Sequence, residues 1–403
     1  MKKSQSRFGR IIVLTGARQT GKTTLAKHLF PNYQYISVED PVAVQEFKKL
    51  TAAQWNSLFP KAILDEIQKE PQLIESIKSV YDQYPDAEYI MLGSSQITLL
   101  RKVRESLAGR SQLVEMYPLT LPEMLTKGWE TEIGLSYYQN LILNNSNHLD
   151  PFLLKKDHPN KQETFETYLK FGAYPAISDT SIPDDEKNEW LNNYVRTYLE
   201  RDIRDLAELR NLEPFTKVQK LLALNTAQLL NYSRIAAEAG VSSKTVQRFL
   251  EYMNISYQTL LLQPWCKNIK KRMVKSPKAH YLDTGVLRAI LRKNDTLNGH
   301  EFESAIVSEI YKQTKVLNLD LSFYHLRTLD GREVDLLIET EEGYIAVEIK
   351  IAETVRTADA GHLRGLNNIL DKPVLQKFVI SNDMNARELE DGVIAISAVQ
   401  FLT

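Results

Sequence analysis

The sequence holds very little cysteine, no long apolar run and no grouped histidines. Cys266 is the only cysteine among 403 residues, which excludes an internal disulfide and favours a reducing compartment. The seven histidines are scattered without the paired spacing of zinc ligands, so no structural zinc site is expected. No apolar run approaches the roughly 18 residues that a membrane-spanning helix needs. We therefore expect a cytoplasmic protein without a membrane partner.

The charge is almost balanced, with a formal net charge of −1, 43% hydrophobic residues and 25% charged residues. This composition is that of an ordinary globular protein with enough length for two or three cores. A surface that binds nucleic acid would have to be local. The start of the chain is basic, but the apolar run at Ile11–Leu14 behind it is too short for a targeting segment and is predicted to be a strand.

A glycine-bounded loop follows this first predicted strand and fits the pattern G-x-x-x-x-G-K-[ST]. Glycines let successive backbone N–H groups curl around phosphates, and the helix N-terminus behind them adds a favourable dipole. We expect Lys22 to reach the β- and γ-phosphates of ATP and Thr23 to place its hydroxyl on Mg²⁺. The residues expected to contact the nucleotide here are Gly16, Ala17, Arg18, Gln19, Thr20, Gly21, Lys22, Thr23 and Thr24.

Two acidic residues and a serine follow other predicted strands. Asp65 and Glu66 end an apolar run that begins at Ala62, and Ser94 follows a run that begins at Tyr89. In a parallel α/β sheet these positions face a ligand at the carboxyl edge. We expect Asp65 to hold Mg²⁺ through water, and Glu66 to orient the attacking water. Ser94 is expected to contact the γ-phosphate or that water, with a helix N-cap as the alternative.

Further short runs complete the predicted organisation. Tyr35–Val38 and Leu113–Met116 are predicted strands, and 71–84 is a predicted helix, so the first domain is an α/β domain with a doubly wound parallel sheet. The expected regions are a P-loop ATPase core at 1–125, a helical region with an insertion at 126–215, a winged-helix-like module at 216–285 and a second α/β domain at 286–403.

The segment 232–250 has the form of a helix-turn-helix. Gly240 makes the turn, Ala236 permits close packing, Ser242 caps the second helix, and Val246 and Leu250 face inward. The outward side chains, available for phosphates or base edges, are Ser243, Lys244, Gln247 and Arg248. A basic stretch follows with Lys267, Lys270, Lys271, Arg272, Lys275 and Lys278. DNA binding is one interpretation, and a protein contact or a lid over the ATPase is the other.

Two predicted strands near the end, 331–338 and 344–350, carry acids and a lysine. Because side chains alternate along a strand, Glu348 and Lys350 lie on one face, with Asp335 on the neighbouring strand. Two carboxylates there could hold Mg²⁺ while Lys350 positions a water for attack on a phosphodiester. A solvent-facing hairpin with an ordinary Glu-Lys pair is the alternative.

This pattern resembles the PD-(D/E)xK restriction-endonuclease-like fold. In that fold an earlier helix adds an acid, and the matching position here is Glu303, with Glu309 as the second choice. The resemblance implies a metal-dependent nuclease with Glu303, Asp335 and Glu348 as metal ligands and Lys350 as a catalytic residue. A domain that keeps the fold without cleavage is also open.

A wider set of motifs covers nearly the whole chain: Gly16–Thr24, Ile63–Gln68, Gly93–Ser95, Glu105–Arg110, Phe171–Pro175, Tyr198–Asp205, Lys275–Lys278 and Leu282–Gly285. Together they resemble the bacterial and archaeal AAA+-type ATPases with a C-terminal domain of unknown function. The chain departs from these proteins in two ways. A helical stretch that usually precedes the loop is absent, so an adenine-side contact is expected to be missing, and 131–166 looks like an irregular, variable insertion.

Arg110 is the candidate for a positive charge delivered to the γ-phosphate, in trans if the protein forms a ring or dimer. A capped helix end, with the arginine near the last carbonyl groups, is the alternative.

These features predict a Mg²⁺-dependent ATPase that couples ATP binding and hydrolysis to action on DNA or on a protein partner, with a homo-oligomer left open. One alternative is an ATP-gated, metal-dependent DNA nuclease, and another is an ATP-switched DNA-binding regulator or scaffold. Glu66 argues against pure binding, because a scaffold needs no water-orienting carboxylate. Asp335, Glu348 and Lys350 argue against a vestigial C-terminal domain.

Overall fold

The computed structural model describes residues 10–94, 105–144, 149, 152–199, 211–267, 276–328 and 331–403. The chain divides into two compact units. Unit 1 holds the described residues up to Pro118 and the short segment Ile255–Tyr257, and unit 2 holds the other described residues from Leu119 to Thr403. The described residues of the three predicted regions at 126–215, 216–285 and 286–403 therefore all lie within unit 2, apart from that short segment.

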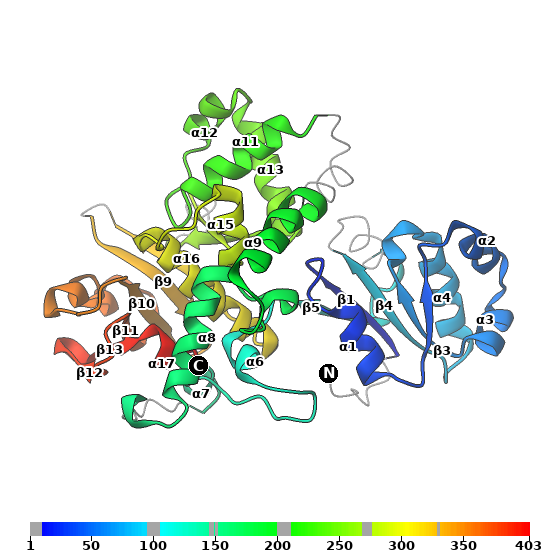
Figure 1. The fold of residues 1–403 in the computed structure, drawn as a ribbon, viewed down its shortest axis with the longest axis horizontal. Coiled ribbons are helices and arrows are strands. Elements are labelled where there is room, and N and C mark those ends of the chain that lie inside the picture. The colour runs from blue at the N-terminus through cyan, green and yellow to red at the C-terminus, as the bar shows by residue number, and fades with distance from the viewer. Residues whose placement is uncertain are drawn as a thin grey trace. The chain divides into compact units, whose positions relative to one another are not determined.

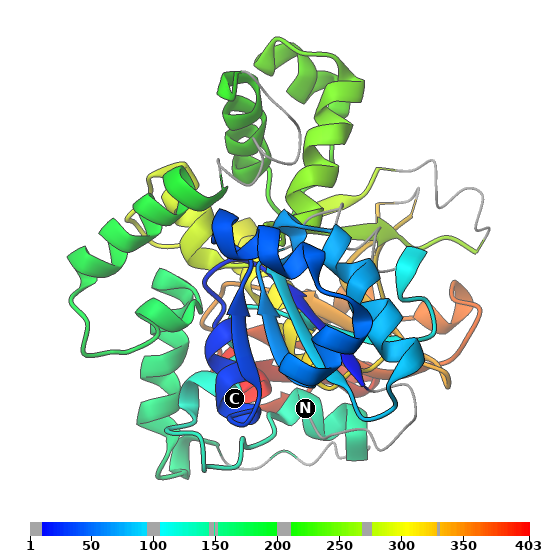
Figure 2. The same cartoon turned by 90° about the vertical axis from the view of Figure 1, so that its right-hand side faces the viewer.

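Unit 1 contains a five-stranded sheet in the order β2-β3-β4-β1-β5, in which every neighbouring pair is parallel (Figure 2). The strands are β1 (Ile11–Gly16), β2 (Gln34–Ser37), β3 (Lys61–Asp65), β4 (Glu88–Ser94) and β5 (Ser111–Met116). This sheet confirms the predicted doubly wound P-loop fold. Since β4 lies between β1 and β3, the ends of these three strands meet at one edge of the sheet.

Helices cover both faces of this sheet: α1 (Lys22–Leu29) on one, and α2 (Pro41–Lys49), α3 (Ala52–Leu58) and α4 (Gln72–Gln83) on the other (Figure 1). Ile11 and Val13 join the core under α2–α4, whereas Ile12 and Leu14 pack with Ala26 of α1. Alternating side chains of a strand thus enter opposite cores, which is why the strand reads as a continuous apolar run.

Unit 2 is built from helices around a mixed sheet. Its helices are α6 (Leu121–Leu125), α7 (Tyr137–Asn144), α8 (His158–Phe171), α9 (Asp184–Asn193), α11 (Glu213–Leu224), α12 (Tyr232–Ala239), α13 (Ser243–Ile255), α15 (Thr284–Leu291), α16 (Gly299–Val316) and α17 (Ala398–Leu402). Within the described ranges, no helix combines the length and the apolar character required to cross a membrane.

The sheet of unit 2 has eight strands in the order β12-β13-β11-β10-β9-β8-β6-β7. They are β6 (Thr259–Pro264), β7 (Lys278–Tyr281), β8 (Ser322–Arg327), β9 (Glu333–Glu339), β10 (Tyr344–Ile349), β11 (Val374–Ser381), β12 (Arg387–Glu388) and β13 (Val393–Ser397). Because β6 and β7 join this sheet through β8, the two predicted regions at 216–285 and 286–403 share one sheet.

The segment 131–166 is more regular than expected, so the prediction of irregular structure was wrong there, whereas its being a variable insertion stays a prediction. It contains α7 and the start of α8, and Tyr138 is fully buried with its hydroxyl 2.6 Å from Oγ1 of Thr314 on α16. Ser136 also donates to Gln313 at 2.6 Å. The error arose because the many polar residues hid a few buried aromatic anchors.

Two of the family motifs meet in the core of unit 2. The Asp283 carboxylate accepts hydrogen bonds from the backbone N–H groups of Ala173 (2.8 Å) and Val286 (3.0 Å). Gly285 brings α15 so close to α8 that a Cβ there would lie 2.0 Å from the carbonyl oxygen of Phe171. The motifs at 171–175 and 282–285 therefore hold two helices together.

Candidate functional site

The phosphate loop connects β1 to α1 and depends on two glycines. A Cβ on Gly16 would lie 2.0 Å from the backbone oxygen of Met116 on β5, and Gly21 has φ +88° immediately before α1. Gln19 also has a positive φ, of 62°. Only glycine fits the first position without moving the neighbouring strand, and the left-handed turns direct the loop back over the helix N-terminus.

Lys22 folds over this loop. Its ammonium group donates to the backbone oxygens of Ala17 at 2.6 Å and Gly16 at 3.2 Å. Thr20 closes the loop from within, because its hydroxyl donates to the same Ala17 oxygen at 2.9 Å and its side chain is buried. The positive charge thus lies where the sequence predicts contact with phosphates, next to the start of α1.

The predicted magnesium ligands Thr23 and Asp65 are in contact. The Thr23 hydroxyl donates to Oδ2 of Asp65 at 2.8 Å, and the hydroxyl of Tyr35 on β2 donates to the same oxygen at 2.8 Å. The other carboxylate oxygen of Asp65 accepts from the backbone N–H of Glu66 at 2.9 Å. A hydroxyl and a carboxylate are oxygen ligands of the kind that Mg²⁺ prefers, so the donor set fits this cation.

Tyr35 is a site residue that the sequence did not suggest. Burial and the Asp65 carboxylate raise the pKa of Tyr35, so its hydroxyl keeps its proton and remains a donor. The only hint in the sequence was a tyrosine on the strand next to the one that ends in Asp65.

Glu66 stands just beyond β3 with a left-handed φ of 57°. Its carboxylate accepts a hydrogen bond from the Gln68 side chain, which is buried two residues later. A non-glycine residue in this region of φ/ψ is uncommon and is often found at functional sites. Gln68 therefore holds the carboxylate that was predicted to orient water.

Ser94 and Arg110 lie at opposite edges of the sheet. The backbone of Ser94 pairs with Gly16 at the end of β4, beside the phosphate loop. Arg110 immediately precedes β5, and the first residue of β5 pairs with Ile11, the first residue of β1. The phosphate loop begins at the other end of β1, five residues later, so Arg110 lies roughly 16 Å along the strands from the loop. Its guanidinium binds Asp82 at the end of α4, at 2.8 and 3.3 Å. Arg110 is thus remote from the phosphate loop of its own chain.

The predicted residues of the C-terminal part come together on one side of the unit 2 sheet. Ile345 pairs with Ile338 and Val347 with Leu336 on the antiparallel strands β10 and β9, and this register continues to place Glu348 opposite Asp335. Asp335 accepts from the backbone N–H of Ile349 at 2.9 Å, and Glu348 accepts from Lys350 at 2.7 Å.

Glu303 reaches the same group from α16, which packs against β7 and β10. We call Glu303, Asp335 and Glu348 the acid centre. The alternative residue Glu309 lies two turns further along α16, where it pairs with Lys312 at 2.8 Å and accepts from the backbone N–H of Leu121 at 2.7 Å. Both Glu309 and Lys312 are fully buried, so this pair stabilises the start of α6 and lies outside the acid centre.

Lys278 does not lie where the sequence predicted. It was placed in a basic surface stretch, but it lies on β7 with 3% of its surface exposed. Its ammonium is 3.0 Å from Glu303, 2.9 Å from Glu333 and 3.6 Å from Asp335. The other members of that stretch, from Lys270 to Lys275, lie outside the described residues. The misplacement arose because a chain of basic residues does not show which one points inward.

The pKa values of these acids are shifted in different directions. Burial raises the pKa of Asp335, and Glu303 raises it further, while burial and Asp335 raise the pKa of Glu348. The pKa of Glu303 is lowered, because its contacts with His300 and Lys278 outweigh burial. Burial alone would lower the pKa of Lys278, but Glu303, Asp335 and Glu333 together raise it. Glu303, Glu333 and Asp335 thus share the Lys278 ammonium, while Glu348 pairs with Lys350.

The donor chemistry of the acid centre suits Mg²⁺, and Oε2 of the buried Glu348 has no hydrogen-bond partner within the described residues. However, no group of three His, Cys, Asp or Glu side chains in the described part of the chain is arranged so that it could hold a metal ion. The Lys278 ammonium lies 3.0 Å from Glu303 and 3.6 Å from Asp335.

The helix-turn-helix has the predicted form. Gly240 ends α12 with φ +70°, and Ser242 accepts from the backbone N–H of Thr245 at 3.1 Å. Val246 and Leu250 are buried, whereas Lys244, Gln247 and Arg248 are exposed and Ser243 is half-buried. The antiparallel pair β6–β7 follows α13. A solvent-facing polar helix face therefore lies on α13.

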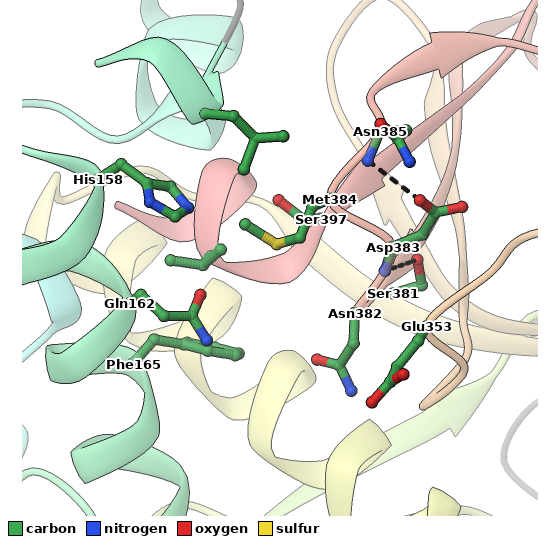
Figure 3. A pocket seen from close by; sticks show the side chains of 12 residues that line it. His158, Gln162, Phe165, Glu353, Ser381, Asn382, Asp383, Met384, Asn385 and Ser397 are labelled. Carbon is green, nitrogen blue, oxygen red and sulfur yellow. Dashed lines mark hydrogen bonds between the residues drawn. The ribbon is translucent and has the colours of Figure 1, made fainter. Parts of the chain in front are cut away.

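A cavity of about 550 Å³ in unit 2 is lined by none of the predicted site residues (Figure 3). In its wall, Asp383 donates from its backbone to Ser381 and accepts from the backbone N–H of Asn385, both at 3.0 Å. We assign it no role in the sites above.

Three families match consecutive parts of the chain. Residues 9–125 match the AAA domain, 162–297 match a domain of unknown function (DUF8612), and 298–401 match a second domain of unknown function (DUF4143). With the loop geometry above, these matches confirm the class predicted from the sequence. The chain thus contains an AAA domain with a P-loop, followed by a C-terminal domain of unknown function.

Similar proteins match most or part of this chain. An uncharacterized protein of Mycobacterium tuberculosis is 26% identical over 400 residues, which cover 98% of this chain and 81% of the relative. The chromosomal replication initiator protein DnaA of Aquifex aeolicus is 25% identical over 273 residues, 57% of this chain and 65% of DnaA. A solved Walker-type ATPase of Pyrococcus abyssi is 15% identical with a TM-score of 0.40, covering 70% of this chain and 91% of its own.

Proposed function

We propose that the chain hydrolyses ATP with Mg²⁺ at the phosphate loop of unit 1 and couples this cycle to action on DNA or on a protein partner. The observation that carries the proposal is the hydrogen bond between Thr23 and Asp65. It joins the loop helix to the acidic strand end, and these are the two segments from which magnesium ligands were predicted.

Each residue has a defined task in this proposal. Bound Mg²⁺ would neutralise phosphate charge, and Thr23 and Asp65 would hold it. Lys22, already centred on the loop, binds the outer phosphates, and the backbone N–H groups from Gly16 to Thr23 bind the others. Glu66, held by Gln68, accepts a hydrogen bond from the attacking water and orients it.

The test compares Lys22→Ala, Glu66→Gln and wild type in ATP binding and steady-state hydrolysis. We expect Lys22→Ala to lose at least about a hundredfold in turnover because phosphate charge goes unmatched, and Glu66→Gln to bind ATP without turning it over. Lys49→Ala is the matched control, since Lys49 is exposed on α2 and pairs only with Glu46 at the surface. Equal turnover in wild type and both site variants would refute the proposal.

The exposed face of α13 favours DNA as the partner. Lys244 and Arg248 provide positive charge beside Gln247, and the DnaA relative is by its name a chromosomal replication initiator. If DNA is bound there, a Lys244→Ala, Arg248→Ala double variant weakens binding to duplex DNA and lowers its salt dependence. Fluorescence anisotropy at several salt concentrations measures both. Unchanged binding would leave a protein partner as the better interpretation.

A second candidate function is metal-dependent cleavage of DNA by unit 2. The observation that favours it is that Glu303, Asp335, Glu348 and Lys350, far apart in the sequence, share one buried group in what we interpret as a restriction-endonuclease-like sheet. The test incubates plasmid with Mg²⁺ or Mn²⁺, with and without ATP. We expect cleavage by wild type and its loss in Asp335→Ala and Lys350→Ala, and cleavage that persists in both would point to contamination.

A further inference from the structure

Lys278 lies beside two members of the acid centre. Its ammonium group lies 2.9 to 3.6 Å from carboxylate oxygens on two elements: Glu303 on α16, and Glu333 and Asp335 on β9. An ammonium at this distance from several carboxylates takes the place that a divalent cation would take, because both are held by charge and by oxygen lone pairs.

The backbone of Lys278 is fixed on both sides. Leu262 of β6 pairs with Lys278 on one side, and Leu229 forms a bridge to it on the other. Because a lysine stem has several rotamers, displacement of the ammonium would require the side chain to move but not the strand. Lys278 also belongs to the segment that matches DUF8612, whereas the acids belong to the segment that matches DUF4143.

His280 gives an independent indication of a cation-binding site. It lies two residues after Lys278 and hence on the same face of β7, and it is fully buried. Neither of its ring nitrogens has a hydrogen-bond partner in the described part of the chain, although it interacts electrostatically with Glu303. A buried polar ring without a partner beside buried acids is expensive unless a ligand uses it.

We propose that the Lys278 ammonium is the built-in cation of the acid centre, and that Mg²⁺ or Mn²⁺ binds there only by displacing it. This deepens the second candidate function, since it concerns the same acids, but it requires no cleavage. In this arrangement the Lys278 ammonium neutralises the acids while no divalent cation is present. It also makes metal affinity depend on anything that moves β7, including the helix-turn-helix that precedes it in the chain.

The experiment measures Mn²⁺ binding to the full chain by electron paramagnetic resonance, without nucleotide so that the phosphate loop contributes no metal complex. Lys278→Met removes the charge and keeps the length of the side chain. We expect this variant to bind Mn²⁺ at least about tenfold more tightly than wild type, because the competing charge is gone. Lys293→Met is the matched control: it breaks a pair with Glu301 outside the acid centre and should leave the affinity unchanged.

A second measurement covers the case in which Lys278→Met folds poorly. Thermal unfolding with increasing Mg²⁺ should then show recovery of the variant and little effect on wild type, and a further Asp335→Asn substitution should abolish the recovery. A variant that neither binds Mn²⁺ more tightly nor regains stability with metal would show that Lys278 is only a structural counter-ion, which overturns the inference. Tight Mn²⁺ binding without any plasmid cleavage would defeat the nuclease function alone.

Discussion

The two groups of acidic residues in this chain are neutralised in different ways. In unit 1, Asp65 is held by neutral hydroxyl groups, from Thr23 and Tyr35, and the nearby ammonium of Lys22 binds backbone oxygens instead. In unit 2, the acid centre is held by the ammonium groups of Lys278 and Lys350. A carboxylate with hydroxyl partners can accept a metal without expelling a charge, whereas one with an ammonium partner must give that partner up.

The largest predicted effect is a loss of stability in unit 1 alone, caused by a substitution at Gly16. Gly16→Ala places a Cβ against the Met116 backbone, so we expect unit 1 to lose about 3 kcal/mol or more, while the sheet of unit 2 keeps its stability. Hydrogen exchange of β1 and β9 amides measures the two separately. Gly299→Ala, in open space at the start of α16, is the control and should change little. Equal losses in both sheets would show that the two units unfold together.

A second prediction concerns His280 beside the acid centre and the stability of unit 2 at low pH. Burial lowers the pKa of His280 to about 3, so the ring is neutral in the fold, whereas the unfolded chain protonates it below about pH 6.5. Its favourable contribution is therefore complete above pH 6.5 and is lost as the pH falls toward 3. Between pH 7 and 5 wild type should lose about 2 kcal/mol more than His280→Leu.

Urea unfolding of unit 2 at the two pH values measures this difference. Glu303, Lys278 and His325 face His280 and titrate in both proteins, so the comparison with His280→Leu isolates the histidine. Parallel pH profiles would mean that the ring already carries a proton or has a water partner in the fold.

The third prediction tests whether hydroxyl groups matter to the first site. Tyr35→Phe removes one donor to Asp65 and should cost about 1 kcal/mol of stability. We also expect the Mg²⁺ concentration for half-maximal ATP hydrolysis to change by about threefold, because Asp65 loses an orienting contact. Tyr33→Phe breaks a similar tyrosine–carboxylate bond, to Glu88 at the far end of β4, and is the control. The same change in both variants would argue against a role for Tyr35 at the metal.

The smallest stability effect concerns Arg110. Its pair with Asp82 is partly exposed, so Arg110→Ala and Asp82→Ala should each change the free energy of unfolding very little. The rate of ATP hydrolysis distinguishes an arginine that contacts a γ-phosphate in trans from a simple ion pair at a helix end. We expect only Arg110→Ala to slow ATP hydrolysis, and only at protein concentrations where chains associate. Equal turnover at every concentration would favour a simple ion pair at a helix end.

Most residues of the first predicted site could be proposed from the sequence because they are consecutive or follow strands. The spacing of Gly16, Gly21 and Lys22 implies the turn, and the apolar run before Asp65 implies the sheet edge. Tyr35 was missed because a lone tyrosine on a strand carries no pattern. The unit 2 strands were also predictable, since Glu348 and Asp335 alternate with apolar neighbours.

The position of Lys278 could not be predicted, because it depends on tertiary packing. The pairing of β6 with β8 adds β7 to the sheet, and α16 then covers it, so one lysine of a basic stretch is turned inward. The helices in 131–166 were hidden for the same reason: Tyr138 is recognisable as a core residue only when Thr314 is known to face it. Long-range contacts, rather than local propensity, decided both.

The position of Arg110 before the first residue of β5 limits how these chains can assemble. Since the guanidinium is at the far edge of the sheet from its own loop, any γ-phosphate that it contacts belongs to another molecule. Such a contact would bring Arg110 of one molecule to the phosphate loop of another. A two-fold symmetric dimer makes the contact twice, reciprocally, whereas a head-to-tail arrangement repeats it around a closed ring or along a helical filament.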